Sequence, residues 1–542
     1  MVADWPILSL IVFSPLLGIA VLLCMPGHRS NWLRTTAVAA SLVPLALALW
    51  LYAEYDPAAG GAAYEERMTW ISVPLNKEAF GSVASFRMEF QYHLGIDGLS
   101  LPLVLLTAVV AVMAALASVH IKKRWKAFYL WFLLLETGML GVFLARDIIL
   151  FFVFFELTLI PMFFLIGIWG LFNREKAANK FLLYNGLGSA IMLVAFVILI
   201  ATAGFSAEQQ ADNRTFDVVY SGSYEALHHN LNDPQSYANQ PGGGSGADNP
   251  YRLTDGMRTA LFVLLLIAFG IKLPIFPFHT WMLRVHAEAT PSIVMIHSGV
   301  LLKIGAYGLI RLGVFLFPEQ AQQWAVALAA LGVVNMLYGA VLAFVQTEFR
   351  LVLAYSSVSH MGIVLLGIAS LNEIGLQGAV FQLVSHGLIS ALLFLIVGSL
   401  YERTGTTRLP ELGGLARPLP FMSGLLLAAG LASLGLPGLS GFIGEFLALL
   451  GLFETQKALA ALAVLGVIMA AVYVLRSVLG ITYGPLNEQH AALPDARLIE
   501  AVPMIALMAL IVLLGVYPSL VTDTLQQSFG PLLDTFIVRE GG

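Results

Sequence analysis

The sequence predicts an all-α integral membrane protein with about fourteen transmembrane helices. Of its 542 residues, 58% are apolar and only 11% are charged, whereas soluble domains carry about 25% charged residues. The apolar residues also gather in long runs. Because a bilayer-spanning helix needs about 20 mainly apolar residues, this composition excludes a soluble globular protein.

Fourteen apolar runs are long enough to cross a bilayer. They lie at residues 6–25, 35–53, 98–119, 128–145, 148–171, 181–204, 257–282, 292–316, 323–346, 351–370, 376–400, 420–453, 458–481 and 500–520.

Basic residues occur in every second connecting loop, which the positive-inside rule places in the cytoplasm. Both termini are then expected outside. The loops concerned hold Arg29 and Arg34, Lys122 to Lys126, Arg174 with Lys176, Arg284, Arg350, Arg403 with Arg408, and Arg497.

Composition also limits the possible partners and cofactors. The net charge is −5, and no basic cluster exceeds Lys122, Lys123, Arg124 and Lys126, so nucleic acid is not expected as a partner. A single cysteine, Cys24, cannot hold an iron–sulfur cluster or a thiolate zinc site. We therefore expect neither a cofactor nor a metal in this chain.

The segment from about 205 to 255 is polar and rich in Gly, Asn and Asp. Such a composition buries too little apolar surface to form a core. We expect it to be a mobile external insertion.

An internal repeat is visible in the motif "NGLGSA" at 185–190, which is similar to "HGLISA" at 386–391. The pairing predicts two inverted five-helix repeats, a pattern typical of transporters. The predicted units are 1–127 (helices 1–3), 128–316 (helices 4–8, with the external loop), 323–481 (helices 9–13) and 482–542 (helix 14 and tail).

Two spans contain helix-breaking residues. These are helix 7, with "FGIKLPIFPFH", and helix 12, with "LGLPGLSGFIGEF", and proline breaks or kinks a helix. Backbone groups freed in this way are tolerated only inside protein or beside a hydrated cavity. Simple packing kinks remain an alternative, but Lys272 and Glu445 beside the breaks favour a functional site.

Ionisable residues fall well inside several spans, where each charge costs about 2.5–3.5 kcal/mol on insertion scales. Structural ion pairs and packed histidines are the alternative interpretations. The groups in question are Glu156, Lys272, Lys303, His360, His386 and Glu445; Glu136, Lys180 and Arg476 are possible additions, and Lys180 is better explained by snorkelling to the interface.

Proton movement needs groups whose protonation their neighbours can switch. A relay that runs through Glu156, Lys272, Lys303, His360 or His386, and Glu445 would combine acids and bases without any metal. Histidine suits the middle of such a relay, because its ordinary pKa lies near neutrality.

Four motifs in order along the chain resemble the antiporter-like membrane subunits of respiratory complex I. They are "FFVFFELTLIPMFFLIGIWG", "FGIKLPIFPFHTWMLRVHAEATPSIVMIHSGVLLKIGAYGLIRL", "AYSSVSHMGIV" and "GLPGLSGFIGEF". The resemblance covers nearly the whole chain. It implies fourteen helices, broken helices 7 and 12, and inverted repeats of helices 4–8 and 9–13.

The resemblance also implies roles for the buried residues. Glu156 and Lys272 would be the essential pair of the first half-channel, and Glu445 the terminal carrier. Lys303, His360 and His386 would form the central hydrated link.

Glu445 stands where related subunits of the L and N types typically have lysine, so the chain is most similar to the M type of NADH–quinone oxidoreductase. That implies proton translocation across a bacterial plasma (inner) membrane, driven by quinone reduction elsewhere in the complex. Flavin, iron–sulfur clusters and quinone would belong to partner subunits, and the direct neighbours would be L-type and N-type subunits and lipids. The peripheral redox arm would be an indirect partner.

Two features leave questions open. A subunit of a multisubunit Na⁺(cation)/proton antiporter shares the same helices and most motifs, and remains the alternative. In addition, Glu348, Arg350 and Leu351 stand where the family usually has Asp, Lys and Arg, so one cytoplasmic basic residue is missing.

Overall fold

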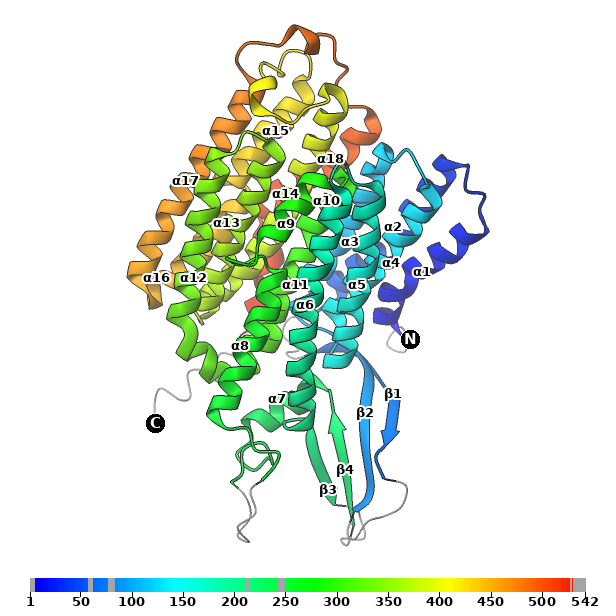
Figure 1. The fold of residues 1–542 in the computed structure, drawn as a ribbon, viewed down its shortest axis with the longest axis vertical. Coiled ribbons are helices and arrows are strands. Elements are labelled where there is room, and N and C mark those ends of the chain that lie inside the picture. Colours follow the sequence, from blue (N-terminus) through cyan, green and yellow to red (C-terminus); the bar gives the residue numbers. More distant parts are fainter. Residues whose placement is uncertain are drawn as a thin grey trace.

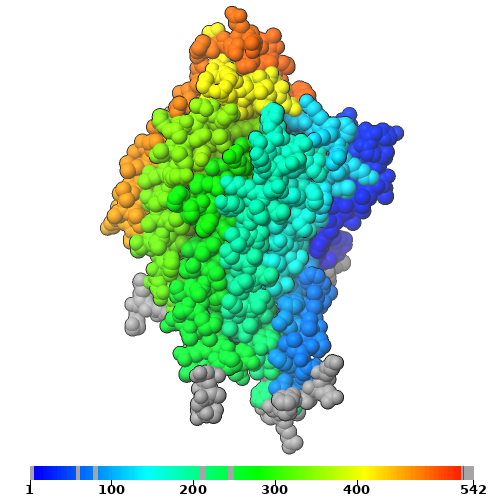
Figure 2. Space-filling model, in the orientation of Figure 1, coloured from blue at the N-terminus to red at the C-terminus, as the bar shows by residue number. Residues whose placement is uncertain are grey.

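The computed structural model describes residues 5–56, 62–76, 83–209, 215–241, 249–526 and 529. Long helices lie side by side in a bundle, and a small sheet extends from one end (Figure 1). We call this the sheet end. The space-filling view shows the N-terminal helices along one side of the bundle. Segments from the C-terminal part of the chain form the end that lies away from the sheet (Figure 2).

Twelve helices in the described part are long and apolar enough to cross a membrane, which confirms the membrane class and the helical bundle. With the shorter helices included, the described residues form eighteen α-helices: α1 (Ile7–Cys24), α2 (Ser30–Glu54), α3 (Ser100–Ala117), α4 (Trp125–Leu144), α5 (Ile148–Trp169), α6 (Arg174–Ala201), α7 (Tyr224–Asn232), α8 (Asp255–Lys272), α9 (Thr280–Glu288), α10 (Pro291–Ile296), α11 (Leu302–Gly308), α12 (Pro318–Val345), α13 (Phe349–Ala369), α14 (Glu373–Thr404), α15 (Pro420–Ser433), α16 (Ser440–Thr455), α17 (Lys457–Thr482) and α18 (Leu498–Val516).

One of the twelve, Pro291–Val314, is assembled from α10 and α11 with two π-helical stretches, His297–Leu301 and Leu309–Val314. Its most apolar stretch is wholly buried inside the bundle. Because π-helical turns occur frequently at functional sites, this helix is a candidate location for the functional site.

The two predicted helix interruptions are present. Helix α8 ends at Lys272 and α9 begins at Thr280, while α15 ends at Ser433 and α16 begins at Ser440. Proline lacks an amide donor and cannot continue a helix, so each span becomes two shorter helices.

Backbone groups freed by the first interruption are satisfied by a neighbouring helix. The Phe276 amide donates to Asn335 Oδ1 at 2.7 Å, and Asn335 Nδ2 donates to the Val358 carbonyl at 2.9 Å. Asn335 lies on α12 and is fully buried. A single amide therefore ties the interrupted segment to α12 and α13, as an apolar surrounding requires.

The sheet was not predicted. Its strands are β1 (Ala63–Pro74), β2 (Val83–Ile96), β3 (Phe205–Gln209) and β4 (Phe216–Ser221), in the order β1-β2-β4-β3, with β2 and β4 parallel and the other pairs antiparallel.

We expected residues 205–255 to form an insertion without a core. This was wrong for the first half of the segment, which forms β3, β4 and α7. Strand β4 finds backbone partners on β2, far away in the sequence. The rings of Phe205 and Tyr251 stack with centroids 3.7 Å apart, next to Tyr220. Long-range pairing and these aromatics supply the order that local composition did not indicate.

A buried ion-pair network joins the sheet to the membrane helices. Asp97, between β2 and α3, lies 2.9 Å from Arg146 Nη1 and 2.6 Å from Arg311 Nη2. Arg146 also contacts Glu225 on α7 at 2.9 Å. Although burial raises the pKa of Asp97, the Arg311 and Arg146 guanidinium groups outweigh it and hold that pKa well below its ordinary value.

Replacing Asp97 with Asn should destabilise the protein by about 3 kcal/mol, because two buried guanidinium groups lose their shared counter-charge. A lowered folded-state pKa gives stability that is complete above the unfolded value of about 3.9 and is lost as pH falls below it. The loss of stability of Asp97→Asn relative to the wild type, measured by thermal unfolding, should thus be constant from pH 5 to 8 and become smaller below pH 4.

Glu411→Gln serves as the control, since Glu411 forms an exposed pair with Arg408 and should change stability by less than about 1 kcal/mol. Equal effects of the two substitutions would show that Asp97 does not anchor the sheet.

Candidate functional site

Lys303 is the centre of the candidate site. It lies on α11 with no exposed surface, and its Nζ is 2.8 Å from His386 Nδ1 on α14. The same Nζ donates to the Ser298 carbonyl in the π-helical turn. Lys303 Nζ is thus in contact with one imidazole and one backbone oxygen, and no ion pair joins it to a carboxylate among the described residues.

From His386 the polar contacts continue toward α16. The rings of His386 and His360 have centroids 5.3 Å apart, and His360 Nδ1 lies 3.3 Å from Glu445 Oε1. Lys303, His386, His360 and Glu445 therefore form one series of adjacent titratable groups. We call these four residues the central series.

Uncharged polar groups hold His360 in place. Gln382 Nε2 lies 3.2 Å from His360 Nδ1, and Ser433 Oγ lies 3.4 Å from His360 Nε2. Both ring nitrogens thus have hydrogen-bonding neighbours inside the bundle. Gln382 lies on α14 and Ser433 on α15, so side chains from two helices position the His360 imidazole of α13 beside Glu445.

Two histidines that the sequence analysis passed over lie beside the central series. His286 Nε2 on α9 is 2.9 Å from His297 Nδ1, and both side chains are fully buried. His297 interacts electrostatically with both Lys272 and Lys303. Both histidines belong to the sequence motif that contains Lys303, and this could have identified them as candidates. A histidine in a packed helix is often structural, however, so the motif alone did not single them out.

Lys272 and Glu156 approach each other without forming a direct ion pair. Lys272 ends α8 with 2% exposure, and its Nζ lies 4.8 Å from the centroid of the Phe155 ring. Glu156 interacts electrostatically with it. In the described part of the chain, neither Lys272 Nζ nor Glu156 Oε1 has a hydrogen-bond partner, and such buried groups call for a functional explanation.

The three additional candidates lie apart from the central series. Glu136 accepts from Ser41 at 2.6 Å, between α4 and α2. Arg476 is exposed; it donates to the Phe344 carbonyl and stacks on that ring at 4.8 Å. Lys180 lies over the Tyr184 ring at 5.6 Å. Glu136 Oε1 is nevertheless buried without a hydrogen-bond partner among the described residues, so Glu136 resembles Glu156 in this respect, whereas Arg476 and Lys180 do not.

Metal-ligand geometry occurs only outside the central series in the described ranges. The two groups are Glu65 with His93 and Glu225, and His120 with Glu402 and Glu500. Arginines already pair with both: Arg146 contacts Glu225, and Arg497 contacts Glu402 and Glu500. The site chemistry described above is that of acids and bases.

Comparisons with known proteins show which family the chain is similar to. The family described as "NADH:quinone oxidoreductase/Mrp antiporter, TM" matches residues 145–470. NADH-quinone oxidoreductase subunit M of Rhodobacter capsulatus is 36% identical over 98% of this chain and 97% of its own length. NAD(P)H-quinone oxidoreductase chain 4 of Gloeobacter violaceus is also 36% identical, over 99% and 94% respectively.

Solved structures give the same result. A chain of respiratory complex I from Thermus thermophilus superposes with a TM-score of 0.81 at 30% identity, covering 99% of this chain and 100% of that one. A chain of the Mrp complex from a Dietzia species has a TM-score of 0.77 at 22% identity, covering 99% of each chain. At that identity the second match shows a shared fold only.

Gly435 should be required at the second interruption. Its φ is +78°, and a Cβ there would lie 2.7 Å from Glu445 Oε2. Gly435→Ala should therefore destabilise the protein by about 1–3 kcal/mol, because alanine is strained in this conformation, and should displace the carboxylate from His360. Thermal unfolding of the purified protein measures the first effect.

The control is Gly424→Ala in α15, where a Cβ meets nothing within 4 Å and alanine favours the helix. A Gly435 variant as stable as the Gly424 variant would contradict this account of the interruption.

Proposed function

The chain belongs to the family of NADH:quinone oxidoreductase and Mrp antiporter membrane subunits, and we propose that it carries protons across a bacterial plasma membrane as the M-type subunit of a respiratory NADH–quinone oxidoreductase. The central series is the observation that carries this proposal. Groups that titrate follow one another from Lys303 to Glu445 inside an apolar bundle. Buried ionisable groups in transmembrane helices mark ion and proton pathways.

The geometry supports a stepwise transfer. A proton on the Lys303 ammonium can pass to His386 at 2.8 Å, and from there through His360 to the Glu445 carboxylate at 3.3 Å. Each recipient is an imidazole or a carboxylate, which are the usual side chains for proton exchange. The chain needs no redox group of its own for these steps.

Lys272 and Glu156 form the control point before the central series. A carboxylate near an ammonium group stabilises the proton on it, and the interaction weakens as the two separate. Since no direct ion pair joins them in the described residues, small movements of α5 against α8 would change this interaction strongly. His297 interacts with Lys272 and Lys303, so it is placed to pass protons between them.

The finer topology is part of the proposal. The twelve long helices, with the interrupted pairs α8/α9 and α15/α16, would make fourteen crossings. Helices 4–8 (128–316) and 9–13 (323–481) would form the inverted repeats, flanked by 1–127 and 482–542. The Leu8 amide donates to Glu66 of β1, which places the start of α1 at the sheet end, and we assign that end and both termini to the outside.

The partners follow from the M-type assignment. L-type and N-type subunits and lipids would surround the bundle, and the peripheral redox arm would act from a distance. Flavin, iron–sulfur clusters and quinone would reside in those other subunits.

The alternative is a subunit of a multisubunit cation/proton antiporter. Glu445 in place of lysine and the 36% identity to subunit M and chain 4 proteins favour the oxidoreductase. Purification of the intact assembly decides between the two. Copurifying flavin and iron–sulfur subunits support the oxidoreductase, whereas their absence together with sodium-dependent proton exchange supports the antiporter.

Lys272→Ala should lower proton pumping by about tenfold or more, the scale of a lost proton-transfer group, and leave assembly largely intact. Pumping is measured as acidification of vesicles containing the intact complex during NADH oxidation. Lys457→Ala is the matched control, because Lys457 is exposed at the start of α17. Normal pumping by the Lys272 variant would contradict the assignment.

A further inference from the structure

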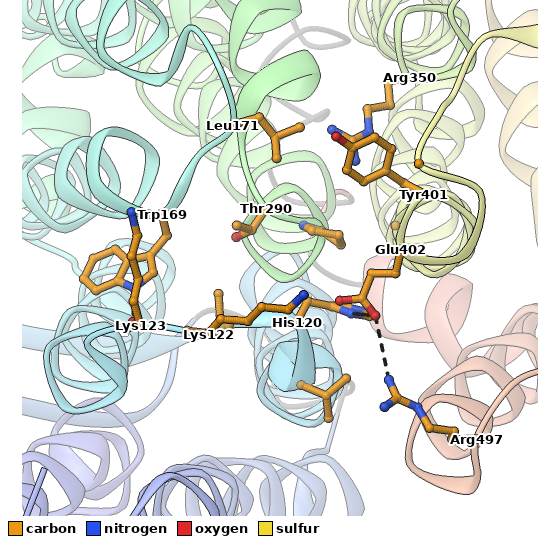
Figure 3. Close-up of a pocket in the computed structure, with 15 residues that line it drawn as sticks. His120, Lys122, Lys123, Trp169, Leu171, Thr290, Arg350, Tyr401, Glu402 and Arg497 are labelled. Carbon is orange, nitrogen blue, oxygen red and sulfur yellow. Dashed lines mark hydrogen bonds and ion pairs between the residues drawn. The ribbon is translucent and has the colours of Figure 1, made fainter. Parts of the chain in front are cut away.

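A cavity of about 600 Å³ opens at the end of the bundle opposite the sheet (Figure 3). Because α3 begins beside β2 and runs away from the sheet, the residues after it lie at this opposite end. The cavity is formed where the ends of α3, α5 and α14 meet the starts of α10, α13 and α18. Its volume is in the range of small-molecule sites.

Basic side chains dominate the charge of this cavity. Lys122, Lys123, Arg350 and Arg497 line it, and Glu402 is its only carboxylate among the described residues. Figure 3 shows Lys123 and Trp169 on one side of the opening and Arg350, Tyr401 and Arg497 on the other. An anion inside would therefore face cations from both sides.

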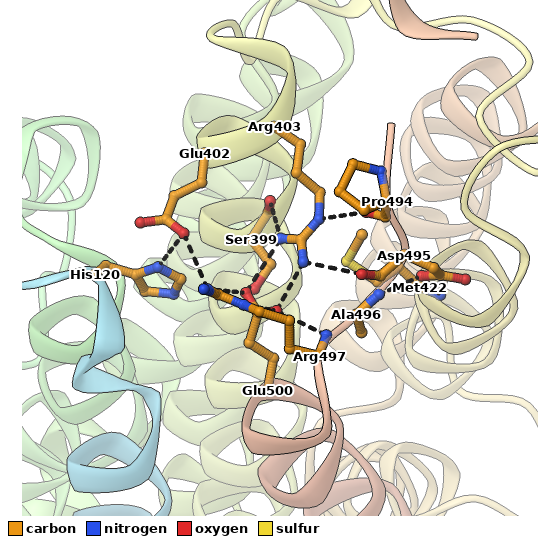
Figure 4. Close-up of polar contacts among 10 residues, drawn as sticks. All are labelled: His120, Ser399, Glu402, Arg403, Met422, Pro494, Asp495, Ala496, Arg497 and Glu500. Atoms are coloured by element: carbon orange, nitrogen blue, oxygen red, sulfur yellow. Dashed lines mark hydrogen bonds and ion pairs between the residues drawn. The ribbon is translucent and has the colours of Figure 1, made fainter. Parts of the chain in front are cut away.

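Glu402 is already engaged and does not neutralise the lysines. Its Oε2 lies 2.6 Å from His120 Nδ1 and 3.7 Å from Arg497 Nη2. Figure 4 shows this carboxylate between the two, with Arg497 also reaching Glu500. The uncompensated charge of the cavity thus comes from Lys122, Lys123 and Arg350.

None of these three cations forms a direct ion pair with a carboxylate of the described residues. Neither lysine ammonium forms an ion pair in the described part of the chain. Arg350 is only 7% exposed; its Nη1 donates to the Ala287 carbonyl at 3.2 Å, and it stacks on the Tyr401 ring at 4.5 Å. This stacking fixes the guanidinium plane and leaves further N–H donors for a ligand.

The nearest carboxylates to Arg350 have other partners. Glu288 accepts from the Asn173 amide at 2.9 Å, and Glu348 accepts from Thr407 at 2.6 Å. Neither lines the cavity. Glu348 and Glu288 act on Arg350 only at longer range, and neither forms an ion pair with it among the described residues. Arg350 is therefore a buried cation that a bound anion would pair with directly, and the exposed Lys122 and Lys123 would attract that anion.

Trp169 and Tyr401 indicate the depth of the cavity. The Trp169 indole donates to the Lys123 carbonyl at 2.7 Å, and both aromatics line the opening. Tryptophan and tyrosine gather at the membrane–water interface, and basic pockets between helices at this level accept phosphate headgroups.

We propose that this cavity binds a phosphate group, carried either by an anionic phospholipid or by a free phosphate. Arg350 would hold the phosphate oxygens in a fork, and Lys122 and Lys123 would supply point charges. The occupant would touch the ends of Pro291–Val314 and α14, the two helices that carry Lys303 and His386. The inference is separate from proton transport and does not require the relay to be correct.

The test uses the intact purified complex with Lys122, Lys123 and Arg350 all replaced by Gln. The control replaces Arg174 and Lys176 with Gln at the start of α6, a basic pair outside the cavity. Native mass spectrometry counts phosphatidylglycerol retained from nanodiscs of phosphatidylcholine and phosphatidylglycerol. Calorimetric titration with inorganic phosphate forms the second arm.

Loss of retained phosphatidylglycerol in the triple variant alone would establish a lipid headgroup, and loss of inorganic phosphate binding in that variant alone would establish a free phosphate. We expect affinity to fall about fivefold for each lysine removed. The proposal is overturned when wild-type and triple-variant complexes retain equal phosphatidylglycerol and phosphate binds neither or binds both equally.

Should the triple variant fail to assemble, Lys122→Gln with Lys123→Gln keeps the test decisive, because both lysines are exposed loop residues whose replacement leaves packing intact. Unchanged retention of phosphatidylglycerol and unchanged phosphate binding in this double variant would likewise reject the proposal.

Discussion

A lysine amino group inside an apolar bundle has to be matched by polar partners, and the contact between Lys303 and His386 meets that requirement. The helix Pro291–Val314 that holds Lys303 is buried along its apolar length. Near its far end, Arg311 pairs with Asp97 and ties it to the sheet. This one helix thus connects the sheet, the central series and the basic cavity, so its position affects the geometry of all three.

The interrupted helices are also related to the need for polar partners inside the bundle. A continuous helix uses its backbone groups internally, whereas the interruptions at Pro274 and Pro437 release some of them. Pro274 is buried inside the bundle, while Pro437 is exposed. At the first interruption, Asn335 accepts a hydrogen bond from one of the freed backbone amides. At the second, Gly435 lets the chain turn close to the Glu445 carboxylate. Each interruption lies next to one of the buried titratable residues, Lys272 at the first and Glu445 at the second.

The helices and their interruptions could be predicted because apolar run length and proline position are local properties of the sequence. The residues of the central series could be predicted because charge is rare in such runs. The pairing of β2 with β4 joins segments that are far apart in the sequence. Neither segment alone indicates that the other is its partner, so the sheet could not be predicted. The His286–His297 pair was missed because nothing in one sequence separates a paired histidine from a packed one, and the outward position of Arg476 was equally invisible.

The central claim is that Lys272 connects to Glu445 through polar groups and water within one continuous path. A cryo-EM map of the intact complex, at a resolution that shows ordered water, tests it most directly. Our account predicts waters that bridge Lys272 to His297 and Lys303, since buried polar groups without protein partners bind water. Apolar side chains packed between these groups, with no water among them, would contradict it.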